Sequence, residues 1–292
     1  MGTEQRSVGL SESAPVVELR ELETVDELRP LEDLQRQVWG IEDVEVVPAT
    51  AMRAAVHAGG LVVAAFVGDE VVGFAFGFVS TPHGGGMSGV GMHSHMAAVR
   101  PGFRRGGVGR KLKLHQAAWC AARGLRWISW TFDPLRAENA KFNLEILGAR
   151  CHDYLTNFYG PMHGTLGRGL ESDRLLAVWD ASEASGPEPS TAGTERPTPS
   201  KGPGPECEWL LRPGDNAVPM PVDRAELLLV RSTRLLVATP DPRADVFAQP
   251  ARAMEWRHAQ RRTLRRALES GWVATGFVDG AYVLERPTET HT

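Results

Sequence analysis

Runs of apolar residues in the first third of the chain follow the pattern of β-strands. Leu61 to Val67 and Val71 to Val79 are apolar, β-branched or aromatic, and Gly68-Asp69-Glu70 separates them. Two such runs around a short glycine turn predict an antiparallel hairpin. An extended pattern resumes from Gly91 to Val99, so we predict three antiparallel strands in this part of the chain.

Helical spacing precedes these strands. Glu27 follows Thr24 by three residues, which is the pattern of a capping box, and leucines recur at helical spacing as far as Trp39. These features predict one helix from Thr24 to Trp39, after a short strand at Val16 to Leu19. Ala49 to His57 predicts a second, short helix.

A glycine-rich turn connects the third predicted strand to a further helix, which we expect to end at Gly124. Strand and helix patterns then alternate along the chain. They predict a buried strand at Leu125 to Thr131, a helix at Arg136 to Leu147 and a strand at Arg150 to Leu155.

The composition changes after Ala181, because most residues from there to Glu208 are Pro, Gly, Ser or Thr. Such a composition predicts a linker. Beyond it, Leu227 to Val230 and Leu235 to Thr239 have strand patterns and Pro250 to Ser270 has a helical one. A hairpin is expected around Asp279-Gly280.

The predicted fold class is therefore α/β (α+β), with a mixed central sheet flanked by helices. We expect a disordered leader at residues 1–14, a main domain at 15–180, a linker at 181–208, a small C-terminal α/β unit at 209–286 packed on the main domain, and a tail at 287–292. The sequence shows no internal repeat of fixed period.

Charge and composition exclude several classes of protein. The net charge of −4 gives no global attraction to nucleic acid or to anionic membranes. No apolar run is long enough to span a membrane, and Met1 to Ala14 is polar and acidic, so we expect a cytoplasmic protein. Cys120, Cys151 and Cys207 are widely spaced, which favours neither a disulfide framework nor a metal site.

The glycine-rich turn is the strongest chemical signal in the chain. Its glycines let the backbone turn tightly and approach a ligand closely, and the helix that follows offers unpaired N–H groups to an anion. A pyrophosphate would be held mainly by backbone amides, with added charge from arginines. The residues of this cradle are Arg104, Arg105, Gly106, Gly107, Val108, Gly109 and Arg110.

Arg104, Gly107 and Val108-Gly109 resemble the acyl-CoA signature of the GNAT superfamily of N-acyltransferases. The predicted order of strands and helices is also similar to that of a GNAT domain. The phrases WTFDPL at Trp130, NFYG at Asn157 and SDR at Ser172 resemble a bacterial branch of predicted acyltransferases. Some relatives in that branch are associated with N-succinylation, so the resemblance leaves the donor open between acetyl-CoA and another acyl-CoA.

The resemblance implies roles for particular residues. The backbone of Ala97, Ala98 and Val99 would contact the pantetheine arm and the thioester, and Asn139 would hydrogen-bond the same arm. His95 is our candidate general base, with His93 on the same strand face, because a neutral imidazole accepts a proton near working pH. A packed or loop-facing histidine is the simpler alternative for each. His57 and His83 are expected to be structural or solvated.

The tyrosine that many GNAT enzymes use as a general acid is replaced here by Leu144. We therefore assign the acid to Tyr159, with Tyr154 as the second candidate. Asp133 and Arg174 are candidates for binding the acceptor, since arginine binds carboxylates bidentately. Helix capping by Asp133 and a local ion pair at Arg174 are the simpler alternatives.

The resemblance thus implies an N-acyltransferase that acts on a primary amine of a small molecule, which includes amino acids as acceptors. A non-catalytic acyl-CoA sensor is the alternative, and Leu144 is the feature that supports it. The arginines between Pro250 and Ser270 suggest a nucleic-acid surface, but the glutamates among them favour a solvated helix face instead. A homodimer is left open.

Overall fold

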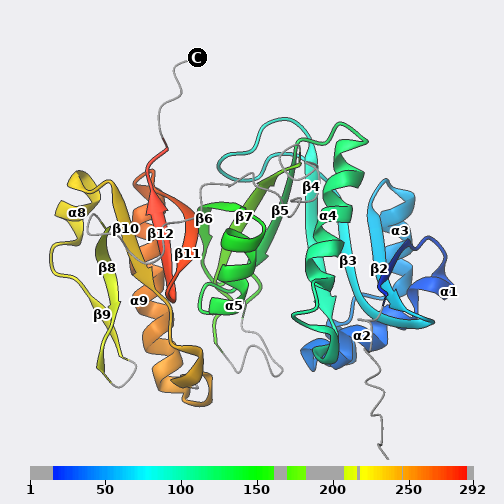
Figure 1. Ribbon diagram of the computed structural model, residues 1–292, viewed down its shortest axis with the longest axis horizontal. Helices are drawn as coiled ribbons and strands as arrows, with labels where there is room; N and C mark the ends of the chain where they lie inside the picture. Colours follow the sequence, from blue (N-terminus) through cyan, green and yellow to red (C-terminus); the bar gives the residue numbers. More distant parts are fainter. Residues whose placement is uncertain (1–15, 161–169, 182–206, 216–217, 245, 288–292) are drawn as a thin grey trace, which may run out of the picture.

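One twelve-stranded sheet runs through the whole molecule (Figure 1). The computed structural model describes residues 16–160, 170–181, 207–215, 218–244 and 246–287; the expected leader, most of the linker and most of the tail lie outside these residues. The strand order is β1-β2-β3-β4-β5-β7-β6-β11-β12-β10-β8-β9. The predicted α/β class with a mixed sheet is confirmed.

The N-terminal unit contains the first seven strands and the helices between them. Its strands are β1 (Glu18–Glu21), β2 (Leu61–Val67), β3 (Glu70–Ser80), β4 (Gly91–Val99), β5 (Trp127–Phe132), β6 (Arg150–Leu155) and β7 (Arg174–Asp180). Its helices are α1 (Val25–Leu28), α2 (Pro30–Trp39), α3 (Ala49–His57), α4 (Val108–Ala121) and α5 (Ala137–Ala140), and a π-helical segment (Lys141–Ile146) continues α5.

Local sequence signals set several of these boundaries. Thr24 and Glu27 form the predicted capping box at the start of α1. The single helix that we predicted from Thr24 to Trp39 is wrong, because a new helix starts at Pro30, where proline is tolerated in the first turn and not in a helix interior. We did not predict β7.

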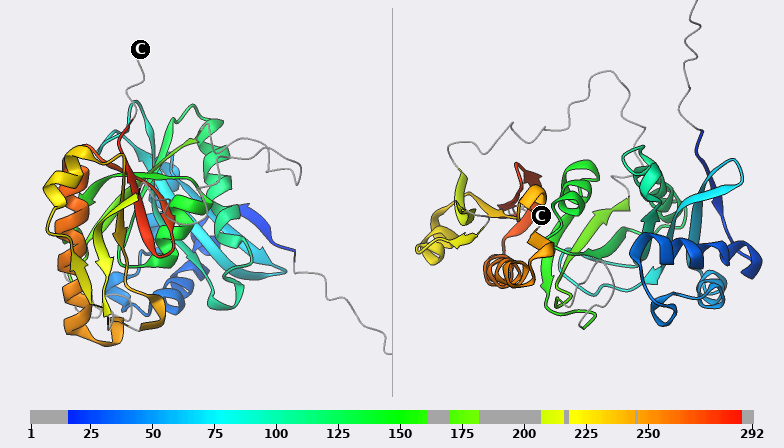
Figure 2. Two further views of the ribbon diagram at one scale, coloured as in Figure 1. Left: turned by 60° about the vertical axis from the view of Figure 1, so that its left-hand side comes forward. Right: turned by 90° about the horizontal axis from the view of Figure 1, so that it is seen from below.

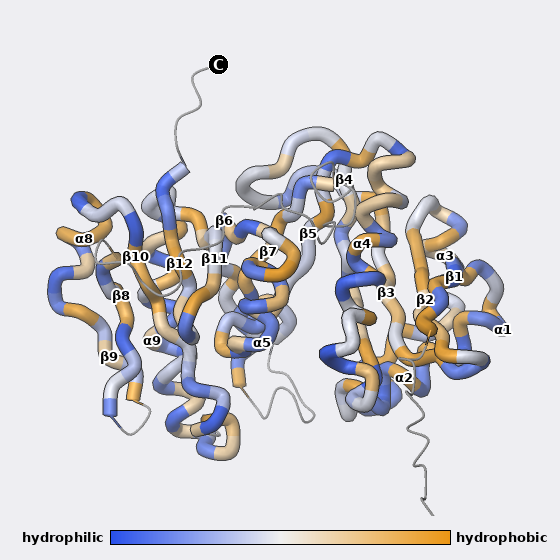
Figure 3. Tube along the Cα trace, viewed as in Figure 1, coloured by the Kyte–Doolittle hydropathy of each residue, from blue (hydrophilic) through white to orange (hydrophobic). Residues whose placement is uncertain are grey.

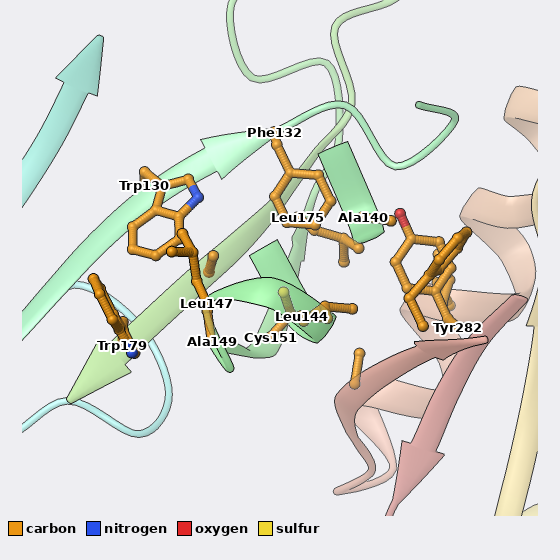
Figure 4. Packing of buried hydrophobic residues seen from close by; sticks show 14 of the residues in the cluster. Trp130, Phe132, Ala140, Leu144, Leu147, Ala149, Cys151, Leu175, Trp179 and Tyr282 are labelled. Atoms are coloured by element: carbon orange, nitrogen blue, oxygen red, sulfur yellow. The ribbon is translucent and has the colours of Figure 1, made fainter. Parts of the chain in front are cut away.

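Two apolar cores lie against the N-terminal unit. Residues of α1, α2 and α3 pack on β2 and β3 in one core, whereas α4 and α5 pack in the other. Strand β2 appears as a hydrophobic segment in Figure 3. Leu144 and Leu147 of the segment that follows α5 pack near Trp130 and Cys151, as Figure 4 shows.

Strands β4 and β5 separate soon after they begin to pair. Their parallel pairing includes only Met92 with Ile128 and His93 with Ser129. On its other side β4 pairs with β3, and the register shifts so that Ser94 and His95 lie opposite the single residue Gly77. A Cβ at Gly77 would lie 2.8 Å from the sulfur of Met92, so glycine is required beside this bulge.

The C-terminal unit repeats the connectivity of the second half of the N-terminal unit. Its elements are β8 (Cys207–Pro213), β9 (Pro219–Pro221), α8 (Ala225–Arg231), β10 (Arg234–Ala238), α9 (Pro250–Glu269), β11 (Val273–Val278) and β12 (Ala281–Glu285). In both halves two parallel strands flank a helix, and a second helix leads to an antiparallel pair: β4, β5, β6 and β7 correspond to β8, β10, β11 and β12.

The two halves join where Ala274 of β11 pairs with Cys151 of β6. The views in Figure 2 place the C-terminal unit at the opposite end of the molecule from α1–α3. The strand predicted at Leu227 to Val230 is wrong, since these residues lie in α8; a short apolar run fits either structure. The hairpin turn at Asp279-Gly280 is confirmed by positive φ angles at both residues.

Within the described residues, no helix is long and apolar enough to cross a membrane.

Candidate active site

A cavity of about 1020 Å³ opens where β4 and β5 separate. It extends from the end of α2, past the second half of β4, to the residues that follow β5 and to the C-terminal unit. The predicted site residues that line it are His95, Ala97, Ala98, Val99, Arg104, Asp133, Asn139, Tyr159 and Arg174. The structure thus brings together nine residues that we selected from the sequence.

The glycine-rich turn forms an open cradle at the start of α4. Gly107 is the N-cap residue and has φ = 80°, a conformation that favours glycine. A Cβ there would meet nothing within 4 Å, so the space beside it is free for a ligand. The first N–H groups of α4 have no intrahelical partners, and Arg104 holds the cradle to β4 by donating from Nε to the Val99 carbonyl at 3.1 Å.

The backbone amides of β4 alternate in direction. Arg100 donates its N–H to the Val72 carbonyl on β3, so the amide of Ala98, two residues earlier, also faces β3. The amides of Ala97 and Val99 face the opposite way, towards the gap left by β5. Two of the three predicted residues therefore present an N–H to the cavity.

His95 lies on the bulge of β4 with its side chain exposed to the cavity. Its ring packs against Phe76 and Phe78, with centroids 5.9 and 6.0 Å away. Burial among these rings lowers the pKa of His95 below its usual value of 6.5. The imidazole is therefore neutral at pH 7, which is the form that a general base needs.

The two tyrosines differ in their surroundings. Tyr159 lines the cavity, is 46% exposed, and its hydroxyl lies 3.2 Å from that of Thr131. The hydroxyl of Tyr154 donates to Asp173 at 2.6 Å, and burial together with this carboxylate raises the pKa of Tyr154 above its usual range. Leu144, at the position expected for tyrosine, is buried in the core.

Charged residues from three segments meet at the far end of the cavity. Asp133 accepts the N–H of Leu135 at 2.9 Å and two hydrogen bonds from Arg257 of α9. Arg174 lies over the ring of Tyr159, with its guanidinium carbon 5.3 Å from the ring centroid. Asp133 thus stabilises a turn and lines the cavity, but the helix capping given as its simpler alternative is wrong, because the N-cap residue of α5 is Arg136 and has no side-chain cap.

Asp173, between Ser172 and Arg174, is fully buried. It accepts hydrogen bonds from Tyr154, from the N–H of Asn157 and from Arg261 of α9. Burial alone would raise the pKa of Asp173, but the hydrogen bonds from Arg261 and Tyr154 outweigh it and lower the pKa. Asp173 therefore anchors the segment that presents Arg174 to the cavity.

Most of the arginines on α9 pair with carboxylates. Arg257 and Arg261 are bound as described above, and the exposed pairs are Arg252 with Glu255, Arg265 with Glu269 and Arg266 with Glu226. These pairs neutralise much of the positive charge that suggested a nucleic-acid surface.

Asn139 lies on α5 at the cavity wall, and Arg105 forms an exposed pair with Glu138.

A buried lysine lies beneath β4, and no local sequence pattern marks it. Lys113 of α4 is 3% exposed and donates to the hydroxyl of Ser94 at 2.8 Å, and its ammonium lies 3.8 Å from the ring centroid of Trp130. Ser94 in turn donates to Gln116 at 2.9 Å. Because burial disfavours the charged form, the pKa of Lys113 falls to about 7.

A mixed sheet with two separating strands, and an anion cradle at the end of one of them, defines an α/β domain of the GNAT type. Residues 19–144 match the family described as "Acetyltransferase (GNAT) family". This match covers less than half of the chain, and it confirms the resemblance to GNAT acetyltransferases that was seen in the sequence.

Solved structures similar to this chain have TM-scores below one half. The ribosomal-protein-S18-alanine N-acetyltransferase from Escherichia coli is 16% identical over 57% of this chain and 94% of its own, with a TM-score of 0.45. Arabidopsis thaliana NAA60 with a bisubstrate analogue is 16% identical over 56% of this chain and 98% of its own, with a TM-score of 0.45. A GNAT family acetyltransferase from Elizabethkingia anophelis with acetyl-CoA bound is 14% identical over 56% and 97%, with a TM-score of 0.43. A comparison with curated proteins found no match.

Among the described residues, no group of three or more His, Cys, Asp or Glu side chains is arranged to hold a metal ion.

Proposed function

We propose that this protein is an N-acetyltransferase that uses acetyl-CoA to acetylate a primary amine of a small molecule. The observation that carries the proposal is the position of His95. It faces a cavity of about 1020 Å³ at the point where β4 leaves β5, and the cradle of α4 lies at the other end of the same strand.

Each part of the site has a role in this reaction. The cradle at Gly107 would hold the pyrophosphate of CoA, and the amides of Ala97 and Val99 would bind the pantetheine arm and the thioester oxygen. His95 removes a proton from the acceptor ammonium, so that the free amine attacks the thioester carbon. Tyr159 donates a proton to the departing thiolate, since its hydroxyl is in the same cavity.

We further propose that the acceptor carries a carboxylate, as an amino acid does. Arg174 lines the cavity beside Tyr159 and donates to the backbone carbonyl of Asp173 at 2.8 Å. The carboxylate of Asp173 is itself bound by Arg261. Arg174 would bind the carboxylate of the acceptor and direct its amine towards His95.

The test has two stages. The first measures the thermal stability of the protein with CoA, acetyl-CoA and succinyl-CoA, because a ligand at about 100 times its Kd adds roughly 2.7 kcal/mol. The second follows thiol release with amino acids and with the corresponding amino acid amides. We expect acids to react faster than amides, and Arg174→Gln to remove that preference.

Two outcomes would contradict the proposal. Equal rates for acids and amides would remove the carboxylate from the acceptor while leaving the transferase in place. Binding of acetyl-CoA without reaction of any amine would favour the alternative of a non-catalytic acyl-CoA-binding module, which the presence of Leu144 at the tyrosine position supports.

A further inference from the structure

His83, Ser129 and His93 form a continuous chain of hydrogen bonds beside the candidate base. The Ser129 hydroxyl of β5 lies 3.0 Å from Nδ1 of His93 and 3.2 Å from Nε2 of His83. Nδ1 of His83 lies 2.9 Å from the carbonyl oxygen of Thr81. Ser129 is fully buried, whereas His83 is exposed on the loop after β3.

The Thr81 carbonyl fixes the order of protons along this chain, because a carbonyl oxygen can only accept. Nδ1 of His83 must therefore carry a hydrogen, and its Nε2 is an acceptor in the neutral ring. The Ser129 hydroxyl then donates to His83 and accepts from Nδ1–H of His93. It follows that Nε2 of His93 is left without a hydrogen, ready to accept one.

The loop that carries His83 is built to lie close to the sheet. The N–H of Gly85 donates to Asp153 of β6 at 2.7 Å. A Cβ at Gly84 would lie 2.5 Å from Leu176, and one at Gly85 would lie 2.9 Å from His152. The glycines after His83 thus allow the loop to lie close enough to the sheet for His83 to reach Ser129.

His93 connects this chain to the cavity. Its ring centroid lies 6.4 Å from that of His95 and 5.4 Å from that of His83. Proton transfer between His95 and His93 would need one bridging water molecule. The charged or titratable groups around it are His83 on the loop, His95 on the same strand and Lys113 on α4. Burial, and then these three neighbours, lower the pKa of His93 to about 4.

We propose that His93, Ser129 and His83 carry the proton that His95 removes from the acceptor amine out to solvent. Nε2 of His93 accepts that proton, Nδ1–H of His93 passes to Ser129, and the Ser129 hydroxyl proton passes to Nε2 of His83. His83, then an imidazolium, releases a proton to water. His93, Ser129 and His83 act on the reaction through His95, so they are positioning residues. The inference rests on the proposed function.

The first test replaces the exposed end of the chain. His83→Ala should lower the turnover of acetyl-CoA and amine about tenfold, less than the roughly 10²- to 10⁴-fold effect of general acid–base catalysis, and added imidazole should restore it. Acetyl-CoA affinity should not change. His57→Ala is the matched control, because His57 is also exposed but lies on α3 away from the chain. Unchanged turnover in His83→Ala, or a loss that imidazole does not restore, would overturn the proposal.

The second test does not depend on activity. Nitrogen-15 NMR of the histidine side chains should find the Nδ1–H tautomer at both His83 and His93, and Ser129→Ala should change the tautomer populations of His93. The Nε2–H tautomer at His93 in the unsubstituted protein would overturn the proposed proton order. If no amine reacts with the unsubstituted protein, the proposed function fails. The histidine tautomers would still show whether the hydrogen bonds of His83, Ser129 and His93 run in the order described above.

Discussion

Arg257 of α9 donates two hydrogen bonds to Asp133, at 2.8 and 2.9 Å, although 124 residues separate them. Arg257 is 1% exposed on its side chain, and Asp133 lines the cavity at the end of β5. The pair therefore joins the C-terminal unit to the wall of the candidate active site. Removing either partner would leave the other with an unpaired charge in a poorly solvated position.

We expect Arg257→Ala to lower the free energy of unfolding by about 3–5 kcal/mol, the usual cost of breaking a buried ion pair. Urea denaturation measures this change. The double variant Arg257→Met, Asp133→Asn should recover part of the loss, because it removes both charges.

Arg266→Ala is the control, since Arg266 and Glu226 form an exposed pair on the same helix. Exposed pairs contribute about 0–1 kcal/mol, so this variant should be close to the unsubstituted protein. Equal free energies of unfolding for the Arg257 and Arg266 variants would show that the buried pair does not stabilise the contact between the two units.

Because of Lys113, the free energy of unfolding should depend on pH in the alkaline range. The pKa of Lys113 in the folded protein is about 7, lower than the ordinary lysine value of 10.5 that the unfolded chain retains. Between these values the unfolded chain binds more protons than the folded protein, so the free energy of unfolding should rise as pH rises from 7 to 10.5. Below the lower value both states are protonated and this contribution is constant. Urea denaturation at several pH values measures the slope.

Lys113→Met provides the comparison, because methionine has a similar length and no charge. This variant should be more stable than the unsubstituted protein near pH 7, and the rise towards alkaline pH should disappear. A rise of the same size in Lys113→Met would assign the pH dependence to other groups.

The parts of the site that could be predicted from sequence are those encoded by neighbouring residues. The cradle at Gly107 needs glycines next to a helix start, and His95 is two residues before Ala97, the first of the amides that face the cavity. The pair Asp133–Arg257 and the contact of Ser129 with His83 join distant segments, and no local pattern marks them. The one available signal for the bulge at His95 was Gly77 in the interior of an apolar strand.

The same reasoning explains which elements of the C-terminal unit could be predicted from the sequence. Its helix α9 and the turn at Asp279-Gly280 have strong local patterns, and both were predicted. The repeat of strand connectivity was not visible, because it is a property of strand order and not of sequence period. The pairing of β6 with β11, together with the hydrogen bonds of Asp133 and Asp173 to arginines of α9, shows how the two halves meet.

Gly107→Glu should abolish binding of CoA and acetyl-CoA. Gly107 has φ = 80°, where a side chain is strained, and a carboxylate there would repel the pyrophosphate. The measurement is the thermal shift with acetyl-CoA, which should be lost. Gly124→Glu is the matched control, because Gly124 has φ = 68° and open space but lies beyond the other end of α4. A retained shift in Gly107→Glu would remove the cradle from the proposed function.

The pKa of His95 gives the proposed reaction a defined pH dependence. Because burial lowers this pKa below 6.5, the base stays neutral through neutral pH and becomes protonated only under more acidic conditions. The rate of a reaction that needs a neutral base falls as pH drops through that pKa. The acidic limb of kcat/KM for the free enzyme should therefore lie below pH 6.5, the ordinary value for histidine.

His95→Gln should lower kcat by about 10²- to 10⁴-fold, the range for loss of a general base, without changing the affinity for acetyl-CoA. The same variant should lose the acidic limb, because glutamine does not titrate. His115→Gln is the control, since His115 pairs with Glu21 on the surface of α4 and does not face the cavity. Steady-state rates from pH 5 to pH 8 measure both effects. An acidic limb that persists in His95→Gln would assign the base to another residue, and His93, its neighbour on β4, would be examined next by the same substitution.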